Sequence, residues 1–230
     1  MSNLKQIFAL QIKPVFLPVI HVESAELAIV NAEIAFDNGA DGIFLIGHGM
    51  TYSDLNPIYE DVRKNFPDQW IGLNYLDRGR KSLDIIPASA NALWADNSGI
   101  DDKDVSQSVI AFNLERRNGP WKGLYFGGTA FKHQSIVNDV SLAAKNAVPY
   151  VDVITTSGPK TGEPPSVSKI RSMRQASWCH PLAIASGMNP ENVSEYMPYV
   201  DCFMVSTGIS ASFSQLDPTK TLAFARQLGK

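Results

Sequence analysis

The sequence predicts a (β/α)8 barrel, an α/β fold in which eight parallel strands alternate with helices. The chain has 230 residues, which suits one barrel of about 250 residues better than two small domains. Short apolar runs recur at intervals of roughly 20 to 30 residues, with helical patterns between them. No linker or low-complexity stretch interrupts the series. We therefore expect residues 1–230 to form one domain.

Each expected strand is apolar throughout, as strands buried on both faces of a parallel sheet are. The expected strands are residues 15–20, 42–46, 70–73, 92–95, 124–126, 151–154, 182–185 and 202–205. Ser24 is expected to cap the first helix, and Gly39 to end it. The apolar face of that helix is predicted to comprise Leu27, Val30, Ile34 and Ala35.

Apolar residues also repeat at helical spacing after most of the other strands. These patterns involve Leu55, Ile58, Tyr59, Val62 and Phe66, then Val105, Val109 and Phe112, then Val137, Val140 and Ala144, then Val167, Ile170 and Met173. A less regular helix is expected at residues 82–86, before Pro87. Asn189, followed by Pro190, predicts a strong helix start, and Asp217-Pro218 predicts the last helix.

The composition excludes several classes of protein. A net charge of −3 and a pI near 5.8 argue against a general nucleic-acid binder, which would carry a basic face. The two cysteines, Cys179 and Cys202, form no disulfide framework, and we find neither a signal peptide nor a long apolar run. These features predict a cytoplasmic protein without a membrane span, and they leave peripheral membrane contact open. A homodimer is expected only because it is common in this class.

Small hydroxyl and glycine residues follow the last three expected strands. Ser186-Gly187 follows the seventh strand and Ser206-Thr207-Gly208 the eighth, while the turn after the sixth contains Gly158, Thr161 and Gly162. Glycine permits close approach of a ligand to the backbone, and free amides donate to anions. These turns therefore suit the phosphate of a small molecule. Tight turns without a ligand are the ordinary alternative.

Polar side chains fall at or just beyond the carboxyl ends of the first five strands, where barrel enzymes place their active sites. They are His21, His48, Asn74, Asp96, Lys132 and His133. His21 can exchange a proton near neutral pH, and burial would raise the pKa of Asp96 toward that of a useful acid or base. Asn74 suits orienting a substrate hydroxyl or stabilising an enolate oxygen. The alternatives are a core histidine, a turn-capping aspartate and a turn asparagine.

Lys132 can form a Schiff base, neutralise a phosphate, or simply be a solvated loop residue. His180 precedes the seventh strand and is expected at the opposite end of the barrel. A divalent metal held by His21, His48, Asp96 and His133 is a further alternative. No H-x-H or H-E-x-x-H spacing supports it, so neither a metal site nor another cofactor is predicted.

Residues 181–208 resemble the phosphate end of the ribulose-phosphate-binding barrels, the superfamily that includes phosphoribosylanthranilate isomerase. The matching features are Ser186-Gly187, the segment from Asn189 to Asn192, and Ser206-Thr207-Gly208. That isomerase uses a cysteine after strand one and an aspartate after strand six. This chain has His21 and then Thr155 or Thr156 at those places, so the isomerase activity is not transferred.

The sixth turn extends the resemblance to the BtpA-like barrel proteins, which share a T-G-x-P-P segment. Thr161-Gly162-Glu163-Pro164-Pro165 matches this segment, and Val19-Ile20-His21 and Ile71-Gly72-Leu73-Asn74 match two further family motifs. Val22-Glu23-Ser24 stands where the family commonly has a Pro-Leu-Pro-Gly loop. The resemblance implies two different functions: stabilising a photosynthetic membrane complex, or acting as a nucleosidase-type or sugar-phosphate enzyme.

The leading hypothesis is an enzyme that binds a small phosphorylated sugar or phosphoribosyl compound at the loops after strands six to eight. His21 and Asp96 would exchange protons at the sugar or its glycosidic bond, in an isomerisation or an N-glycosidic cleavage. The first alternative is a non-catalytic BtpA-like assembly factor, which an occluded barrel mouth or a large exposed apolar patch would favour. Metal-dependent hydrolysis is the second alternative.

Overall fold

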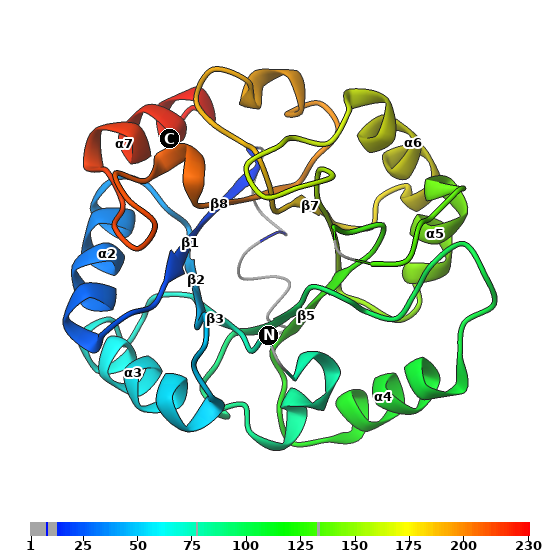
Figure 1. The fold of residues 1–230 in the computed structure, drawn as a ribbon, viewed down its shortest axis with the longest axis horizontal. Helices are drawn as coiled ribbons and strands as arrows, with labels where there is room; N and C mark the ends of the chain where they lie inside the picture. Colours follow the sequence, from blue (N-terminus) through cyan, green and yellow to red (C-terminus); the bar gives the residue numbers. More distant parts are fainter. Residues whose placement is uncertain (1–7, 9–12, 77, 133) are drawn as a thin grey trace.

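The structure, a computed structural model, describes residue 8 and residues 13–76, 78–132 and 134–230, and it confirms the (β/α)8 barrel (Figure 1). Eight parallel strands pair in chain order, and β8 closes the ring against β1, with Cys202 opposite Val15. The strands are β1 (Val15–His21), β2 (Ile43–Ile46), β3 (Ile71–Asn74), β4 (Ala92–Ala95), β5 (Leu124–Gly128), β6 (Val153–Thr156), β7 (Leu182–Ile184) and β8 (Cys202–Val205).

Helices form the outer layer of the barrel (Figure 1). Those in the described part of the chain are α2 (Ala25–Asp37), α3 (Tyr52–Asn65), α4 (Gln107–Asn118), α5 (Val140–Ala147), α6 (Val167–Ser177) and α7 (Pro218–Gln227). Short 3-10 turns are η1 (Gly79–Asp84), η2 (Val193–Glu195) and η3 (Thr207–Ile209). Within the described residues, no helix is both long enough and apolar enough to span a bilayer.

The prediction of a helix that starts at Asn189 is wrong, because only η2 forms between β7 and β8. The Asn189 side chain accepts hydrogen bonds from the backbone N–H groups of Glu191 (3.0 Å) and Asn192 (2.9 Å). Asn189 therefore caps a tight turn as its residue type favours, but the chain reaches β8 before a longer helix develops. The less regular helix expected at 82–86 is η1, a 3-10 turn that begins earlier.

The first helix, α2, has the predicted ends but a different buried face. The Ser24 hydroxyl accepts from the Leu27 amide at 3.2 Å, and Gly39 follows the helix with φ +89°. Its buried residues are Ala28, Asn31, Ala32 and Ala35. Of the four residues predicted for this face, only Ala35 is buried, and Val30 is 44% exposed. A narrow stripe of small side chains lets the helix lie close to the strands, and the larger apolar residues flank it.

Alternate residues of each strand point into the barrel, as the two-residue period of a strand requires. They fill the interior as one buried cluster that includes Leu17, Phe44, Trp94, Phe126 and Met204. Phe44 is central to this cluster, because its ring makes edge contacts with Trp70, Trp94 and Phe126 at 5.1 to 5.7 Å between centroids. A Cβ at Gly72 would lie 2.3 Å from the Phe44 ring, so only glycine fits opposite it. The interior is a packed core and not a pore.

A repeated polar contact joins the strands at their amino-terminal ends. An Asp or Asn just before each even-numbered strand accepts a hydrogen bond from a backbone N–H at the start of the preceding odd-numbered strand. The same carboxylate or amide also binds a basic side chain. This side chain comes from the helix that precedes the odd-numbered strand around the ring, or from just beyond the end of that helix. We call these four contacts latches, and their acceptors are Asp41, Asn91, Asp152 and Asp201.

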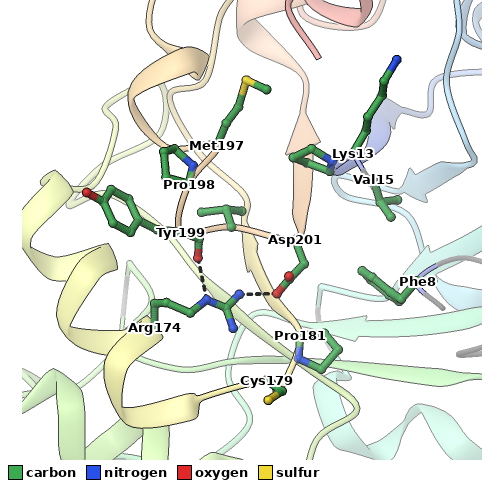
Figure 2. Close-up of a pocket in the computed structure, with 12 residues that line it drawn as sticks. Phe8, Lys13, Val15, Arg174, Cys179, Pro181, Met197, Pro198, Tyr199 and Asp201 are labelled. Atoms are coloured by element: carbon green, nitrogen blue, oxygen red, sulfur yellow. Dashed lines mark hydrogen bonds and ion pairs between the residues drawn. The ribbon is translucent and has the colours of Figure 1, made fainter. Parts of the chain in front are cut away.

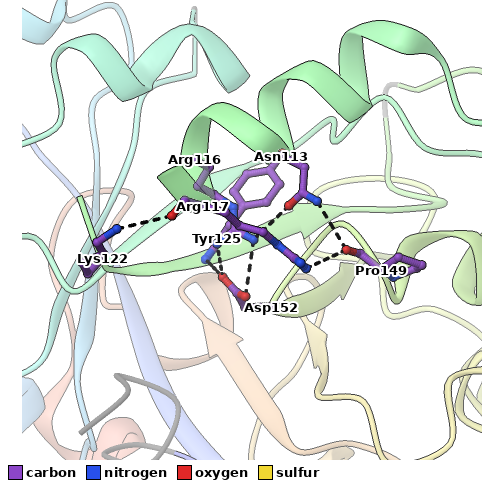
Figure 3. Close-up of polar contacts among 7 residues, drawn as sticks. All are labelled: Asn113, Arg116, Arg117, Lys122, Tyr125, Pro149 and Asp152. Carbon is purple, nitrogen blue, oxygen red and sulfur yellow. Dashed lines mark hydrogen bonds and ion pairs between the residues drawn. The ribbon is translucent and has the colours of Figure 1, made fainter. Parts of the chain in front are cut away.

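The latch at Asp152 lies between α4 and the start of β5 (Figure 3). Arg116 of α4 binds Asp152 at 2.6 Å, and Asp152 accepts from the Tyr125 amide at 2.7 Å. The Arg116 side chain is only 7% exposed. Arg116 also binds the Asn113 side-chain oxygen and lies over the Tyr125 ring. The carboxylate and both terminal nitrogens of the guanidinium are thus hydrogen-bonded, which favours a buried ion pair, while Nε is buried without a partner among the described residues.

The other three latches have the same arrangement. Arg174 of α6 binds Asp201 (Figure 2), and Arg63 of α3 binds the Asn91 side chain at 2.7 Å. Lys230, beyond the end of α7, binds Asp41 at 2.6 Å. Residues 149–152 and 198–201 both read Pro-Tyr-Val-Asp, so part of this fourfold pattern is visible in the sequence.

Candidate functional site

Four predicted residues lie at the mouth of the barrel because they continue the inward-pointing rows of their strands by two residues. His21 follows Val19 in this way, and Asp96 follows Trp94. His48 and Asn74 stand in the same relation to the inward-facing positions of β2 and β3. The period of two in a strand therefore directs all four side chains toward the barrel axis.

A cavity of about 290 Å³ occupies this mouth. Polar and glycine residues predicted for the site form much of its wall: His21, His48, Asp96, Lys132, Thr161, Gly162, Ser186, Gly187, Ser206, Thr207 and Gly208. Apolar side chains, among them Trp94, Met204 and Phe213, complete the wall. Basic, acidic and small residues from seven connections thus face one space at the carboxyl ends of the strands.

Three aromatic rings pack together at one side of the cavity. The imidazoles of His21 and His48 are nearly parallel, with centroids 4.7 Å apart, and Phe213 contacts both at 4.4 and 5.2 Å. Burial, together with the smaller effects of the nearby His48 and Lys132, lowers the pKa of His21 to about 4. His21 is therefore neutral at pH 7. Among the described residues its buried Nδ1 has no hydrogen-bond partner, so this nitrogen is available for a hydrogen bond with a ligand.

Burial also lowers the pKa of His48, against an opposing effect of Asp96. Asp96 accepts a hydrogen bond from the Asn74 side chain at 3.0 Å. Asn74 is 1% exposed and does not line the cavity. Its placement favours the orientation of Asp96 over contact with a substrate. The Asn74 Oδ1 atom is buried without a partner among the described residues, so only the amide nitrogen of this side chain is hydrogen-bonded.

Lys132 is half-buried in the cavity wall, unlike the solvated loop lysine that was one of the alternatives. Burial lowers the pKa of its amine, and the charge of Asp96 opposes this effect. His133 lies outside the described residues. His180 lies at the amino-terminal end of the barrel, as expected, where its carbonyl accepts from Arg174.

The glycines of the last three connections allow these turns to pack closely against one another. A Cβ at Gly187 would lie 2.2 Å from the Pro164 nitrogen, and one at Gly208 would lie 2.0 Å from the Met188 carbonyl oxygen. The Ser186 hydroxyl lies 3.0 Å from the carbonyl oxygens of Lys160 and Glu163. Ser186 therefore ties the β7 turn to the β6 turn, and its hydroxyl proton is already engaged.

Backbone amides remain as donors for an anion at these turns. Within the described residues, the N–H groups of Gly187, Thr207 and Gly208 are paired with no acceptor. Thr207 is exposed at the cavity edge, and Gly162 has φ +80° with open space beside it. These positions can approach a ligand, whereas a Cβ at Gly158 would lie 2.0 Å from the Glu163 carbonyl oxygen. Gly158 does not line the 290 Å³ cavity.

Two further cavities flank the barrel. One of about 830 Å³ lies between the connections after β5 and β6, contains Gly158 and Lys169 in its wall, and adjoins the mouth at Lys132. Another of about 310 Å³ lies at the amino-terminal ends of the strands (Figure 2). The guanidinium of Arg174 there binds the carbonyls of Trp178, His180 and Tyr199 as well as Asp201. That charge is already satisfied by the protein.

Three residues at or behind the mouth were missed by sequence reasoning. Phe213 covers the two histidines although it is 62% exposed, and no local pattern signals it. Asn31 is fully buried in α2, where an asparagine on the inner face was a usable signal. Lys169 reaches from α6 to the carbonyls of Ala130 and Ser157 at 2.6 and 2.7 Å. Within the described residues, no three His, Cys, Asp or Glu side chains are grouped to hold a metal ion.

Comparison with known proteins identifies the fold but no family. No protein-family model and no curated protein matches the chain, so the likeness to BtpA-like proteins remains one of motifs. Solved structures do match. One is (S)-3-O-geranylgeranylglyceryl phosphate synthase from Thermoplasma acidophilum with its substrate sn-glycerol-1-phosphate. It has 12% identity and a TM-score of 0.69, and the match covers 99% of this chain and 98% of that one.

Two other similar structures are barrels of about the same extent. Monomers of the dimeric phosphoribosylanthranilate isomerase from Thermotoga maritima have 18% identity and a TM-score of 0.63, with 94% and 98% of the chains covered. Orotidine 5'-monophosphate decarboxylase from Methanocaldococcus jannaschii has 12% identity and a TM-score of 0.62, with the same coverage. At these identities the likeness establishes a shared fold.

Proposed function

We propose that the protein is an enzyme that binds a small phosphorylated sugar or phosphoribosyl compound at the barrel mouth. The observation that carries the proposal is the single cavity shared by His21, His48, Asp96 and Lys132 with the glycine turns after β6, β7 and β8. The phosphate would be held by the amides of Gly187, Thr207 and Gly208, because these N–H groups face no protein acceptor among the described residues. The sugar would extend toward the histidines and Asp96.

The likeness to barrels with phosphorylated substrates supports this assignment. The names of the similar structures include a synthase with bound sn-glycerol-1-phosphate and a decarboxylase of a nucleoside monophosphate. Proton transfer at the sugar, in an isomerisation or an N-glycosidic cleavage, would fall to Asp96, oriented by Asn74. His21 would act as an acceptor, since it is neutral at pH 7. An open mouth that brings ionisable side chains and glycine turns into one space supports an enzyme over the non-catalytic assembly factor.

Thermal denaturation tests the phosphate site directly. A ligand at about 100 times its dissociation constant stabilises the folded state by about 2.7 kcal/mol, which for a chain of this size raises Tm by roughly 5 to 10 °C. We expect glycerol 3-phosphate and ribose 5-phosphate at millimolar concentration to raise Tm. Thr207→Asp should abolish the shift, because its carboxylate would repel the phosphate.

Ser212→Asp is the matched control for that substitution. Ser212 is exposed in the same connection but does not line the cavity, so this variant carries the same added charge away from the amides. It should keep most of the Tm shift. The proposal fails if no phosphorylated compound shifts Tm, or if both variants respond alike.

A further inference from the structure

We propose that Lys132 is a covalent site for carbonyl compounds: its amine condenses with the aldehyde or ketone of a phosphorylated open-chain compound to form an imine. The inference deepens the proposed function, because it relies on the phosphate turns to hold the other end of the same molecule. It names the substrate class as phosphorylated aldehydes and ketones.

Lys132 differs from Lys169, another half-buried lysine near the mouth, in what its amine contacts. Lys169 Nζ binds the carbonyl oxygens of Ala130 and Ser157 at 2.6 and 2.7 Å, so two of its protons have protein acceptors. Lys132 Nζ donates to no described residue and lies 5.6 Å from the Phe131 ring centroid. It lines both the mouth cavity and the adjoining one. A half-buried amine without an acceptor among the described residues is placed to meet a ligand.

The backbone around Lys132 is held in place by three contacts. The Lys132 amide donates to the Ser157 hydroxyl at 2.7 Å. The carbonyl of Ala130, two residues earlier, accepts from Lys169 Nζ and from the Thr156 hydroxyl at 3.2 Å. Ala130 has φ +48°, a conformation that costs energy in a residue with a Cβ. These contacts fix the direction in which the Lys132 side chain leaves the chain, as a covalent site requires.

The surroundings of the amine suit imine formation. Burial lowers the pKa of Lys132, which increases the fraction of free amine compared with a surface lysine. Asp96 and His48 line the same cavity and can move protons. Trp94 and Met204 make the nearby wall apolar, which limits competing water. The charge of Asp96 acts on this amine and opposes the lowered pKa, and its carboxylate lines the same cavity as a proton acceptor.

The reaction balances without an oxidant or a reductant. The neutral amine nitrogen attacks the carbonyl carbon, the carbonyl π electrons move to oxygen, and that oxygen takes a proton as the nitrogen gives one up. The resulting carbinolamine loses its hydroxyl as water after a second protonation, as the nitrogen lone pair forms the C=N bond of an iminium ion, which then releases its N–H proton to leave the imine. Asp96 is the group we expect to relay these protons. Amine and carbonyl compound thus give imine and one water.

Borohydride trapping tests the inference on the full chain. Dihydroxyacetone phosphate is incubated with the protein, and sodium borohydride then reduces any C=N bond to a stable amine. The protein should gain the mass of the ligand less one oxygen atom, and peptide mapping should place the gain on Lys132. Unphosphorylated dihydroxyacetone should label at least about tenfold more slowly, because it lacks the binding energy of the phosphate.

Variants identify the amine that reacts. Lys132→Arg keeps a positive charge and should lose the label, with circular dichroism and Tm used to show that it is folded. Lys160→Arg, at an exposed lysine of the β6 turn, is the matched control and should keep the label. Label on Lys169, or label spread over surface lysines, would overturn the inference.

The hypothesis of an imine at Lys132 and the hypothesis of a phosphate site can be tested separately. Glycerol 3-phosphate has no carbonyl group, so its effect on Tm reports the phosphate turns alone. If it raises Tm and dihydroxyacetone phosphate is not trapped, the covalent role of Lys132 is wrong and the proposed function stands. If glycerol 3-phosphate has no effect and nothing is trapped, both are wrong.

Discussion

His21 is the residue at the mouth whose chemistry depends most on the fold. Its pKa falls to about 4 because the ring is largely enclosed and faces His48 and Lys132. A histidine read from sequence alone is expected to titrate near 6.5, and that expectation is wrong here. The neighbours responsible come from two other connections, so no local pattern could have revealed the shift.

The lowered pKa of His21 makes folding stability depend on pH in a known direction. Below about pH 6.5 the unfolded chain binds a proton at this histidine, whereas the folded chain resists it until about pH 4. The contribution is therefore complete above pH 6.5 and is lost as the pH falls toward 4. His21→Gln removes it. From pH 7 to 4.5 we expect the wild type to lose about 1 to 2 kcal/mol more unfolding free energy than the variant, after discounting for solvent.

Urea denaturation at both pH values measures this difference. The comparison between the two proteins cancels the titration of the other groups, as long as the variant keeps the same fold. Parallel losses of stability in wild type and variant would show that His21 is not protected from protonation.

The positions of the candidate residues were more predictable than their environment. The expected strand ends located His21, His48, Asp96 and Lys132 near the mouth, and counting by two from the apolar residues of each strand would have shown which side chains face inward. Contacts between connections were not predictable. Ser186 binds carbonyls of the neighbouring turn, and Phe213 covers histidines that lie more than 160 residues earlier in the sequence.

The connection between β8 and α7 is the element that carries Phe213 over the histidines. It folds back on itself through a bridge between Ser210 and Leu216 and a hydrogen bond from Ala211 N–H to the Gln215 carbonyl. Its base is held by Asn31 of α2, which donates to the Ser214 carbonyl at 2.7 Å and accepts from the Leu216 amide at 2.8 Å. One buried amide side chain thus fixes the loop from outside the barrel.

Asn31→Leu keeps a similar volume and removes both hydrogen bonds. The Leu216 amide and the Ser214 carbonyl would be left without their partner, and each such loss in a buried setting costs about 1 to 3 kcal/mol. We expect a loss of about 2 to 4 kcal/mol in unfolding free energy by urea titration. Asn65→Leu removes one exposed hydrogen bond of α3 and should change stability by less than about 0.5 kcal/mol. Equal effects of the two substitutions would contradict the role of Asn31.

Sequence signals for elements succeeded where they are local and failed where packing decides. Ser24 and Asp217 cap their helices through hydrogen bonds to Leu27 and Lys220, as predicted. The start at Asn189 has equally good local chemistry, yet the short path from β7 to β8 leaves room only for η2. The inner face of α2 was also misjudged, because the largest apolar residues are not those that fit closest to the strands.

At the scale of the whole molecule, the stabilising latches and the candidate site are separated along the barrel axis. The latches lie at the amino-terminal ends of the strands, and the candidate site lies at the carboxyl-terminal ends. This separation is general for barrel enzymes, in which one face serves stability and the other chemistry. The (β/α)8 architecture itself was predictable, since each strand and most helices have strong local patterns.

Breaking a latch should therefore affect stability and not ligand binding. Asp152→Ala leaves the nearly buried Arg116 without its carboxylate and should lower the unfolding free energy by about 3 kcal/mol. Asp61→Ala breaks an exposed pair with Lys64, whose side chains are 49% and 73% exposed, and should cost less than about 1 kcal/mol. Both variants should keep the Tm increase produced by glycerol 3-phosphate. Loss of that increase in folded Asp152→Ala would show that the two ends are coupled.

The latch at Asp41 joins the segment after α7 to the segment before β2, so the fourfold pattern continues around the whole ring. Lys230 does for β1 what Arg63, Arg116 and Arg174 do for β3, β5 and β7. In this contact, β1 is therefore equivalent to the other odd-numbered strands. A circular permutant that begins at β3 and joins the segment after α7 to β1 through a linker would keep all four latch contacts, and we expect it to form the same barrel.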